Sequence, residues 1–314
     1  MDGEGWTPRQ RDRMERVFGR TEGFVPVRPF PALDPALALR FTKQLETGLE
    51  DVAEGFSREE LLSINKHDLS SVFKCEGLYL AESAAFEWAT QKAVGTVVGR
   101  AMTAMLTPFA RGLAPMELVD QAFQAIIREG KSLALYVQEC GAVERAELAA
   151  EATDRLTKFQ TDFPQVSPRW IPRIECPVLV PLCEGRIQLR GKYDLALGRP
   201  GITPSEVVVV DFKSGAERSE HRDDARFYAL LETLRNEVPP FRVASYYLDS
   251  GESRAEDVDE GVLEAAVRRT IDGARRIADM RQSARTPHLT PGGYCTFCTA
   301  LPECPVGREW IRSG

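Results

Sequence analysis

The stretch RGKYDLALGRPGITPSEVVVVDFKSG, residues 190–215, carries acidic and basic residues inside an otherwise apolar pattern. From 186 to 194 every even position is polar or charged, whereas Ile187, Leu189 and Tyr193 alternate with them. This alternation predicts a strand with one buried face. The valine run at 207–210 predicts a second strand, buried on both faces. The residues between the two runs are rich in glycine and proline and predict a turn.

Asp194, Asp211 and Lys213 are the charged residues of this stretch that suggest chemistry. Residues two apart on a strand share a face, so Asp211 and Lys213 point to the same side. If the two strands pair as a hairpin, Asp194 lies close to level with Asp211. Two converging carboxylates repel each other unless a cation separates them, and Mg²⁺ or Mn²⁺ prefers such oxygen ligands.

Lys213 beside such an ion could orient or deprotonate a water and offset charge on a phosphoryl group. The three residues therefore indicate metal-assisted hydrolysis of a phosphodiester. The plainer alternative is a solvated Asp–Lys pair at the end of a strand, because so short a motif recurs by chance.

Helical periodicity dominates the chain before this stretch, and mixed elements follow it. Apolar spacing and breaker residues predict a helix near 35–50, two helices within 58–87, helices over 88–160 with breaks near 108–115, Gly130 and Gly141, a helix over 221–237, a strand at 241–249 and an arginine-rich helix over 257–285.

Three cysteines lie close together near the end of the sequence, in CTFCTALPEC: Cys295, Cys298 and Cys304. Glycine and proline around them prevent one continuous regular element. Thiolates at this spacing indicate a structural zinc or an iron–sulfur site, and both need a fourth ligand. Cys140, Cys176 and Cys183 occur in apolar contexts and are expected to be small core residues.

The GxxD strand, the turn, the apolar run ending in DxKSG and a following helix with a tyrosine resemble the PD-(D/E)XK nuclease superfamily. The resemblance is closest to its RecB-like exonuclease branch, with the AddB nuclease domain and the CRISPR-associated exonucleases. It implies that Asp194 and Asp211 bind metal and that Lys213 is catalytic. It also implies that Tyr228 and Asp224, in RDDARFYALL, help to position the lysine and the DNA.

Two positions depart from the pattern of that branch. Asp224 stands where glutamine is usual, and an ionised aspartate cannot donate a hydrogen bond. In KAVGTVVGRAM the position of a histidine metal ligand is Gly99. Strand-like alternation also precedes residue 186, within PRWIPRIECPVLVPLCEGRIQLRGKYDLAL (168–197), and predicts an earlier strand there. Glu175, on that strand, is a candidate replacement ligand, although a salt bridge is the plainer role for it.

The cysteine spacing resembles that of RecB-like nucleases with a 4Fe–4S cluster, whose first cysteine lies far upstream. That resemblance implies Cys75, in FKCEGLYLAE, as the fourth ligand beside Cys295, Cys298 and Cys304. A structural zinc with four cysteines remains the alternative. Either group would connect Cys75 to the C-terminal tail and close a long loop.

The resemblance covers about 60–310 and implies an α/β fold. The expected architecture is a restriction-endonuclease-like mixed central sheet flanked by helices, with a helical insert and a C-terminal iron–sulfur staple. The expected divisions are an N-terminal extension (1–60) and a nuclease domain (61–314), itself made of a helical portion at about 61–160, a catalytic sheet at about 163–250, and a C-terminal helix with the cysteine cluster at 257–314.

Composition limits the partners. The chain has 314 residues, 43% hydrophobic and 28% charged, with a net charge of −7. It has no apolar run long enough for a membrane span and no secretory signal, so we expect a cytoplasmic location and no membrane partner. The acidic balance counts against extensive DNA contact but allows a local basic surface. Arg190 and Lys192 share the polar face with Asp194 and could flank a phosphate backbone.

The sequence thus predicts a metal-dependent DNA nuclease, an exonuclease on single-stranded DNA or DNA ends, acting alone or with a helicase or other complex subunit. The alternative is a catalytically impaired, nuclease-like protein that binds DNA or serves as a scaffold in a repair or defence complex. Gly99 and Asp224 favour the alternative, whereas the retention of Asp194, Asp211 and Lys213 together favours the nuclease.

Overall fold

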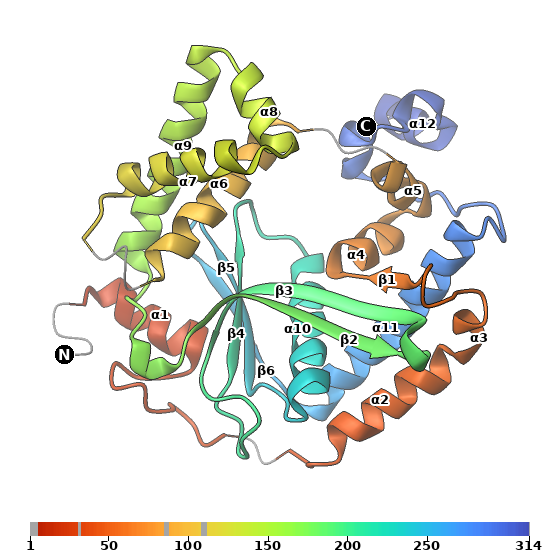
Figure 1. Cartoon of the computed structure of the whole chain (residues 1–314), viewed down its shortest axis with the longest axis horizontal. Coiled ribbons are helices and arrows are strands. Elements are labelled where there is room, and N and C mark those ends of the chain that lie inside the picture. Colours follow the sequence, from red (N-terminus) through yellow and green to blue (C-terminus); the bar gives the residue numbers. More distant parts are fainter. Residues whose placement is uncertain (1–5, 31–32, 85–87, 108–111, 314) are drawn as a thin grey trace.

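A mixed β-sheet with helices on both faces organises the molecule (Figure 1). The computed structural model describes residues 6–30, 33–84, 88–107 and 112–313, and within them the sheet has six strands. The strands are β1 (Leu62–Ile64), β2 (Arg173–Leu182), β3 (Ile187–Leu197), β4 (Val208–Lys213), β5 (Arg242–Tyr247) and β6 (Ser253–Asp257). The mixed α/β fold expected from the sequence is confirmed.

Strand β3 is the centre of the sheet because it pairs with three other strands. Strand β2 runs antiparallel along one edge of β3, from Ile187 to Ala196. The other edge is shared: β1 is parallel to residues 187–189, and β4 is antiparallel to residues 195–197. The carboxyl ends of β1 and β4 therefore approach each other along the middle of β3. Beyond β4, β5 pairs parallel to it and β6 antiparallel to β5.

Two hydrophobic cores lie on the two faces of the sheet. Alternate valines of the 207–210 run enter different cores, Val207 and Val209 one and Val208 and Val210 the other. The run is thus buried on both faces, as its composition predicted.

The α-helices of the described residues are α1 (Pro8–Phe18), α2 (Leu37–Gly48), α3 (Glu50–Ala53), α4 (Lys66–Lys74), α5 (Glu76–Ala84), α6 (Thr90–Met105), α7 (Pro115–Glu129), α8 (Ser132–Glu139), α9 (Ala142–Asp162), α10 (Glu220–Asn236), α11 (Glu260–Arg281) and α12 (Pro305–Ser313).

Helices α2, α4, α10 and α11 contribute to the first core, and α1 with α6 to α9 contribute to the second (Figure 1). The helical breaks near Gly130 and Gly141 are confirmed, since α7, α8 and α9 meet there. The break near 108–115 includes residues 108–111, which lie outside the described residues. Two short strands, β1 and β6, were not expected, because three to five residues give too little periodicity to recognise. Because β6 includes residue 257, the arginine-rich helix begins at 260 instead of 257; it ends at 281 instead of 285.

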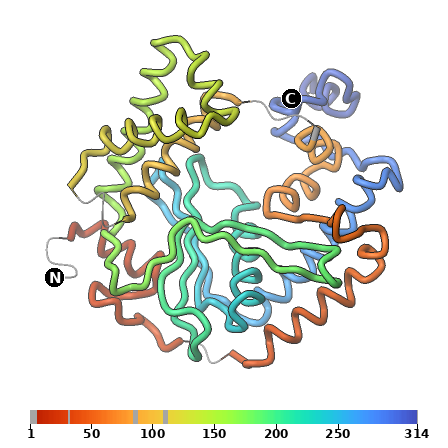
Figure 2. The backbone as a smooth tube through the Cα atoms, in the orientation of Figure 1, coloured from red at the N-terminus to blue at the C-terminus, as the bar shows by residue number. Residues whose placement is uncertain are grey.

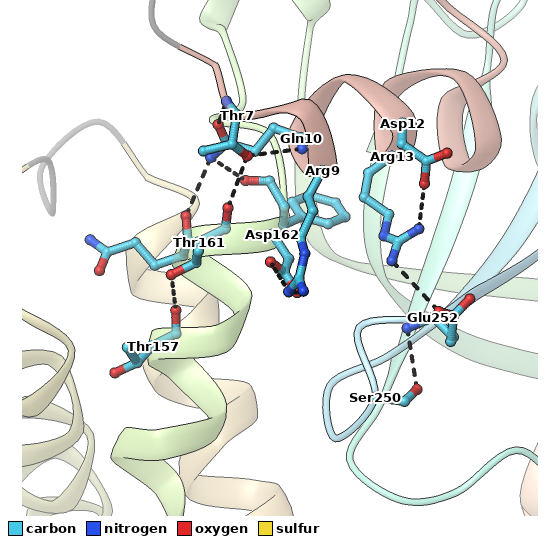
Figure 3. Close-up of polar contacts among 12 residues, drawn as sticks. Thr7, Arg9, Gln10, Asp12, Arg13, Thr157, Thr161, Asp162, Ser250 and Glu252 are labelled. Carbon is cyan, nitrogen blue, oxygen red and sulfur yellow. Dashed lines mark hydrogen bonds and ion pairs between the residues drawn. The ribbon is translucent and has the colours of Figure 1, made fainter.

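The N-terminal helix α1 is fastened to the second core by polar contacts (Figure 3). Thr7 and Gln10 form a capping box at its start. Arg9 pairs with Asp162 at the end of α9, at 3.2 Å, and Arg13 lies 3.9 Å from Glu252 in the β5–β6 turn (Figure 3). Residues of the first sixty therefore help to close the core beside the sheet.

No helix in the part of the chain that the structure describes combines the length and hydropathy needed to span a bilayer.

Candidate active site

The β3–β4 hairpin places the two predicted aspartates opposite each other. Leu195 pairs with Val210, and continuing that antiparallel register by one residue brings Asp194 level with Asp211. Asp194 Oδ2 accepts a hydrogen bond of 2.6 Å from the backbone N–H of Phe212. This side-chain bond replaces a backbone bond where the two strands separate. The approach of the two carboxylates expected from the hairpin is therefore present.

Two lysines contact Asp211 in the space between the ends of β1 and β4. Lys66, directly after β1, places its Nζ 2.8 Å from Asp211 Oδ1. Lys213 Nζ lies 2.7 Å from Asp211 Oδ2 in an ion pair. Asp211 itself is only 2% exposed. The sequence predicted Lys213 but gave no signal for Lys66, which reaches the site because of the short, unexpected strand β1.

Helix α10 supplies the two other predicted residues, one turn apart. Asp224 Oδ2 accepts a hydrogen bond of 2.7 Å from Lys213 Nζ. Tyr228 donates its hydroxyl to the Lys192 carbonyl at 2.7 Å. The glycine of GxxD, Gly191, permits this approach, since a Cβ there would lie 2.9 Å from Tyr228 Cε1. Asp194, Asp211, Lys213, Asp224 and Tyr228 are therefore all gathered at one site.

The two carboxyl groups of the site, Asp194 and Asp211, differ in pKa. Burial and the neighbouring Asp211 raise the pKa of Asp194 to about 7. Burial also acts to raise the pKa of Asp211, but Lys66 and Lys213 outweigh it and hold that pKa well below its usual range. Burial lowers and Asp211 raises the pKa of Lys213, with a net rise that keeps the ammonium protonated. Asp211 is thus the permanent anion, and Asp194 titrates near neutrality.

These residues suit a hard divalent cation. Asp211 Oδ2 makes no directed hydrogen bond although it is buried, and Asp194 is an acid that an adjacent cation would ionise. Carboxylate oxygens are the ligands that Mg²⁺ and Mn²⁺ prefer. Among the described residues, however, no group of three or more His, Cys, Asp and Glu side chains is arranged to hold a metal ion. The two aspartates are consistent with a partial ligand set for such an ion.

Glu175 lies beside Asp194, on the neighbouring strand. The register of β2 with β3, which pairs Ile174 with Leu195 and Cys176 with Tyr193, puts Glu175 opposite Asp194. Glu175 has a φ of 51°, a strained backbone conformation for a non-glycine residue. Its carboxylate forms an ion pair with Lys192. Lys192 therefore competes with any metal ion for this carboxylate.

A cleft of about 910 Å³ lies beside Glu175 and Lys192, between them and helices α6 and α7. Gly99, which the resemblance aligned with a histidine ligand, lines it and would have open space around a Cβ. Arg100 of α6 and Arg128 of α7 also line the cleft. Arg190 is exposed on the same face of β3 as Lys192. Of the two predicted basic residues, Lys192 therefore lines the cleft, and Arg190 lies two residues before it on the same strand.

All four predicted cysteine ligands line one other cavity, of about 210 Å³. Cys75 caps the end of α4, and Cys295, Cys298 and Cys304 come from two 3₁₀ turns, η4 (Gly293–Phe297) and η5 (Leu301–Glu303), and the residues after each. Figure 2 shows the C-terminal segment beside the α4–α5 segment, far from it in sequence. The cavity wall is otherwise largely apolar, with Leu78, Leu289, Leu301 and Val306.

Backbone groups and glycines face the sulfur atoms. The N–H of Gly292 donates to Cys295 Sγ at 3.4 Å, and the N–H of Gly307 donates to Cys304 Sγ at 3.3 Å. A Cβ at Gly307 would lie 3.4 and 3.5 Å from the Cys304 and Cys295 sulfurs. Burial, followed by the neighbouring thiols, raises the pKa of Cys298. Four thiols around one cavity form a donor set for a metal group, although they do not converge as a single-ion site.

Ser70 is a second residue that the sequence gave no reason to select. Its hydroxyl donates to Asp224 Oδ1 at 2.9 Å, one turn of α4 after Lys66. A serine and a lysine in an ordinary capped helix carry no functional signal. Their contacts depend on how α4 packs against α10, which periodicity does not predict.

Comparison with known proteins gives a family and weak structural likenesses. A solved structure described as a "putative exonuclease" from Eubacterium rectale has a TM-score of 0.45 and 12% identity, covering 81% of this chain and 90% of its own. The crystal structure of SSO0001 has a TM-score of 0.36 and 14% identity, covering 86% of this chain and 97% of its own. No curated protein matches the sequence. The model of the PD-(D/E)XK nuclease superfamily matches residues 69–305, and the chain belongs to that superfamily.

Proposed function

We propose that the protein is a metal-dependent deoxyribonuclease of the RecB-like branch that acts as an exonuclease. The observation that supports it best is the contact network in which Lys213 bridges Asp211 and Asp224, while the hairpin holds Asp194 opposite Asp211. By the resemblance, Asp194, Asp211 and Lys213 are the residues that would carry out phosphodiester hydrolysis. Their joint presence at the end of a strand pair favours a working site over a solvated surface pair.

Asp194 and Asp211 would hold Mg²⁺ or Mn²⁺, the ions typical of this superfamily. Such an ion would supply an activated water and positive charge for the scissile phosphate. Glu175, opposite Asp194 and lining the same cleft as Gly99, would complete the ligand set in place of the missing histidine. Its strained backbone supports this role, because strain of that kind gathers at functional positions.

Lys213 would orient water and stabilise charge on the phosphate. Because the pKa of Lys213 is raised, its side chain stays a protonated ammonium. It therefore donates hydrogen bonds and does not act as a general base. Asp224 holds the lysine as an acceptor, so the glutamine of the branch pattern is replaced by a charged partner. Tyr228 packs on the strand that carries Asp194 and fixes the helix against it.

Nucleic acid would reach the site through the cleft beside Glu175. Arg100, Arg128 and Lys192 line that cleft, and a phosphate backbone is attracted to such cations. Arg190 would extend the contact along β3. The substrate that the resemblance to the RecB-like branch implies is single-stranded DNA or DNA ends. We expect this activity in the cytoplasm, by the protein alone or together with a helicase or other complex subunit.

The four cysteines would hold a 4Fe–4S cluster. All four line one cavity with a largely apolar wall, and their spacing resembles that of the cluster-bearing nucleases of this branch; a structural zinc is the alternative. A cluster would join Cys75 to the C-terminal segment and act structurally. Anaerobically purified protein should be brown with absorbance near 400 nm, characteristic of iron–sulfur clusters. A colourless protein with one zinc per chain would contradict the cluster.

Nuclease assays test the proposal directly. End-labelled single- and double-stranded DNA is incubated with Mn²⁺ and wild-type protein, Asp211→Asn or Lys213→Met. Cleavage by the wild type and its loss in both variants are expected. The control is Asp223→Asn, next to Asp224 but facing Arg269 at 3.4 Å. Cleavage that persists in Asp211→Asn would overturn the site, and DNA binding without cleavage under any metal would favour the scaffold.

A further inference from the structure

Helix α4 presents two polar residues to the candidate active site from one face. It follows β1, and Asn65 caps it in a capping box with Asp68. Figure 1 shows α4 between β1 and α5. Lys66 and Ser70 are four residues apart, so their side chains lie on one side of the helix. Lys66 is outside the residues that match the superfamily model, 69–305.

The contacts of these two residues enclose the catalytic groups. Lys66 Nζ donates to Asp211 Oδ1 at 2.8 Å and lies 4.6 Å from the centre of the Tyr228 ring. Ser70 Oγ donates to Asp224 Oδ1 at 2.9 Å. Between the two acids lies Lys213, 2.7 Å from each. The contacts therefore form a closed path from α4 through β4 and α10 back to α4.

We propose that Lys66 and Ser70 are positioning residues of the nuclease site. Lys66 fixes the carboxylate of Asp211, and Ser70 fixes Asp224 so that it holds Lys213. Ser70 matters here because Asp224 replaces an amide: a carboxylate only accepts hydrogen bonds, and each of its oxygens needs its own donor. This inference rests on the proposed function and assigns two residues to its site.

Two neighbours on α4 provide matched controls. Lys74 also joins α4 to α10, through Glu220 at 2.6 Å, and its side chain is 28% exposed, as is that of Lys66. Ser71 follows Ser70 but donates to Glu82 instead of Asp224. Lys74→Met and Ser71→Ala therefore remove comparable contacts from the same helix without touching the site.

Steady-state cleavage of single-stranded DNA with Mn²⁺ measures the positioning role. Loss of one charged hydrogen bond corresponds to about 10- to 100-fold, so we expect Lys66→Met to lower kcat by that factor. Ser70→Ala should lower kcat by about 3- to 10-fold. KM should change less than about threefold in both, and Lys66→Arg should restore part of the rate. Lys74→Met and Ser71→Ala should keep kcat within about twofold of wild type.

The controls decide the outcome. Equal losses of kcat in Lys66→Met and Lys74→Met would overturn the role of Lys66. Equal losses of kcat in Ser70→Ala and Ser71→Ala would overturn the role of Ser70.

Calorimetric titration of Mn²⁺ into the protein at one fixed pH gives a readout that needs no cleavage. Lys66→Met removes a cation from Asp211 Oδ1, so Mn²⁺ should bind about tenfold tighter even though kcat falls. Lys66→Arg, Ser70→Ala and Lys74→Met should bind Mn²⁺ as wild type does. Mn²⁺ binding to Lys66→Met that is unchanged or weaker would overturn the assignment of Lys66. A wild type that binds Mn²⁺ but never cleaves would instead refute the proposed function alone.

Discussion

The carboxylate–lysine site and the cysteine cavity are built in opposite ways. In the first, Asp194, Asp211 and Lys213 come from one hairpin, and each charge has a partner within the protein. In the second, Cys75 and the three C-terminal cysteines come from segments about 220 residues apart, on a helix end and short 3₁₀ turns. Sheet ladders hold the first in place, whereas the second brings together thiols in a largely apolar cavity.

This difference predicts how strongly the folding of each site would depend on its proposed metal group. Two lysines compensate the buried charge of Asp211, and Asp194 can keep its proton, so the fold of this site should survive without metal. The cysteine cavity has little regular structure around it, so a bound cluster would contribute directly to the folding of the tail. Changes at the first site should therefore affect chemistry, and changes at the second should affect stability.

The largest effect is expected at the cysteine cavity. Cys295→Ser, at the most buried of the four cysteines, should remove the cluster and lower the Tm by about 10 °C, a loss of several kcal/mol for a chain of this size. Thermal unfolding followed by circular dichroism, with limited proteolysis near 283–300, measures it. Cys140→Ser, outside the cavity, should change Tm by less than about 2 °C. Equal Tm values for the two variants would refute the structural dependence.

Lys213→Met should lower kcat for DNA cleavage by about 100-fold or more, because it removes the protonated donor at the phosphate. Its Tm should remain within a few degrees of wild type, unlike that of Cys295→Ser. Comparison of kcat and Tm for the two variants separates chemistry from stability. A Tm loss in Lys213→Met as large as in Cys295→Ser would remove the contrast between the sites.

Asp194 gives the carboxylate site a pH dependence. Its pKa is raised from 3.8 to about 7 by burial and Asp211, so the folded protein keeps a proton that the unfolded chain releases. The free energy of unfolding should therefore fall as pH rises from about 4 to 7. Asp194→Asn cannot ionise at this position and so lacks this loss. With a chelator present, the free energy of unfolding of Asp194→Asn minus that of the wild type should therefore increase from about pH 4 to 7 and level off above pH 7. Urea titrations at several pH values measure this, and a constant difference would contradict the raised pKa.

The smallest effect is expected from Gly307→Ala, which tests the fit of the cavity wall. The new Cβ would lie 3.2 Å from Leu301 Cδ1 and within 3.5 Å of two sulfurs, at a cost of about 1 kcal/mol. Gly293→Ala, in the same tail, would meet no atom within 4 Å and should be neutral. Urea titration distinguishes the two. A neutral Gly307→Ala would mean that the wall tolerates expansion.

The sequence located the main elements of the sheet but not its edges. The alternation before Asp194 and the valine run fixed β3, β4 and their hairpin register, because side-chain period and turn chemistry are local properties. Strands β1 and β6 were missed, since their pairing depends on β3 and β5 and not on their own residues. Missing β1 also meant missing Lys66, whose position follows from that strand.

By itself, the sequence determined which residue types could do the chemistry: two acids and a lysine on paired strands, and cysteines at ligand spacing. Only the tertiary structure decided their surroundings. It placed Glu175 opposite Asp194, gave Asp224 two donors and assembled four thiols around one cavity. Local patterns set the conformation of each segment, but the pKa and partners of a buried charge depend on atoms brought from distant parts of the chain.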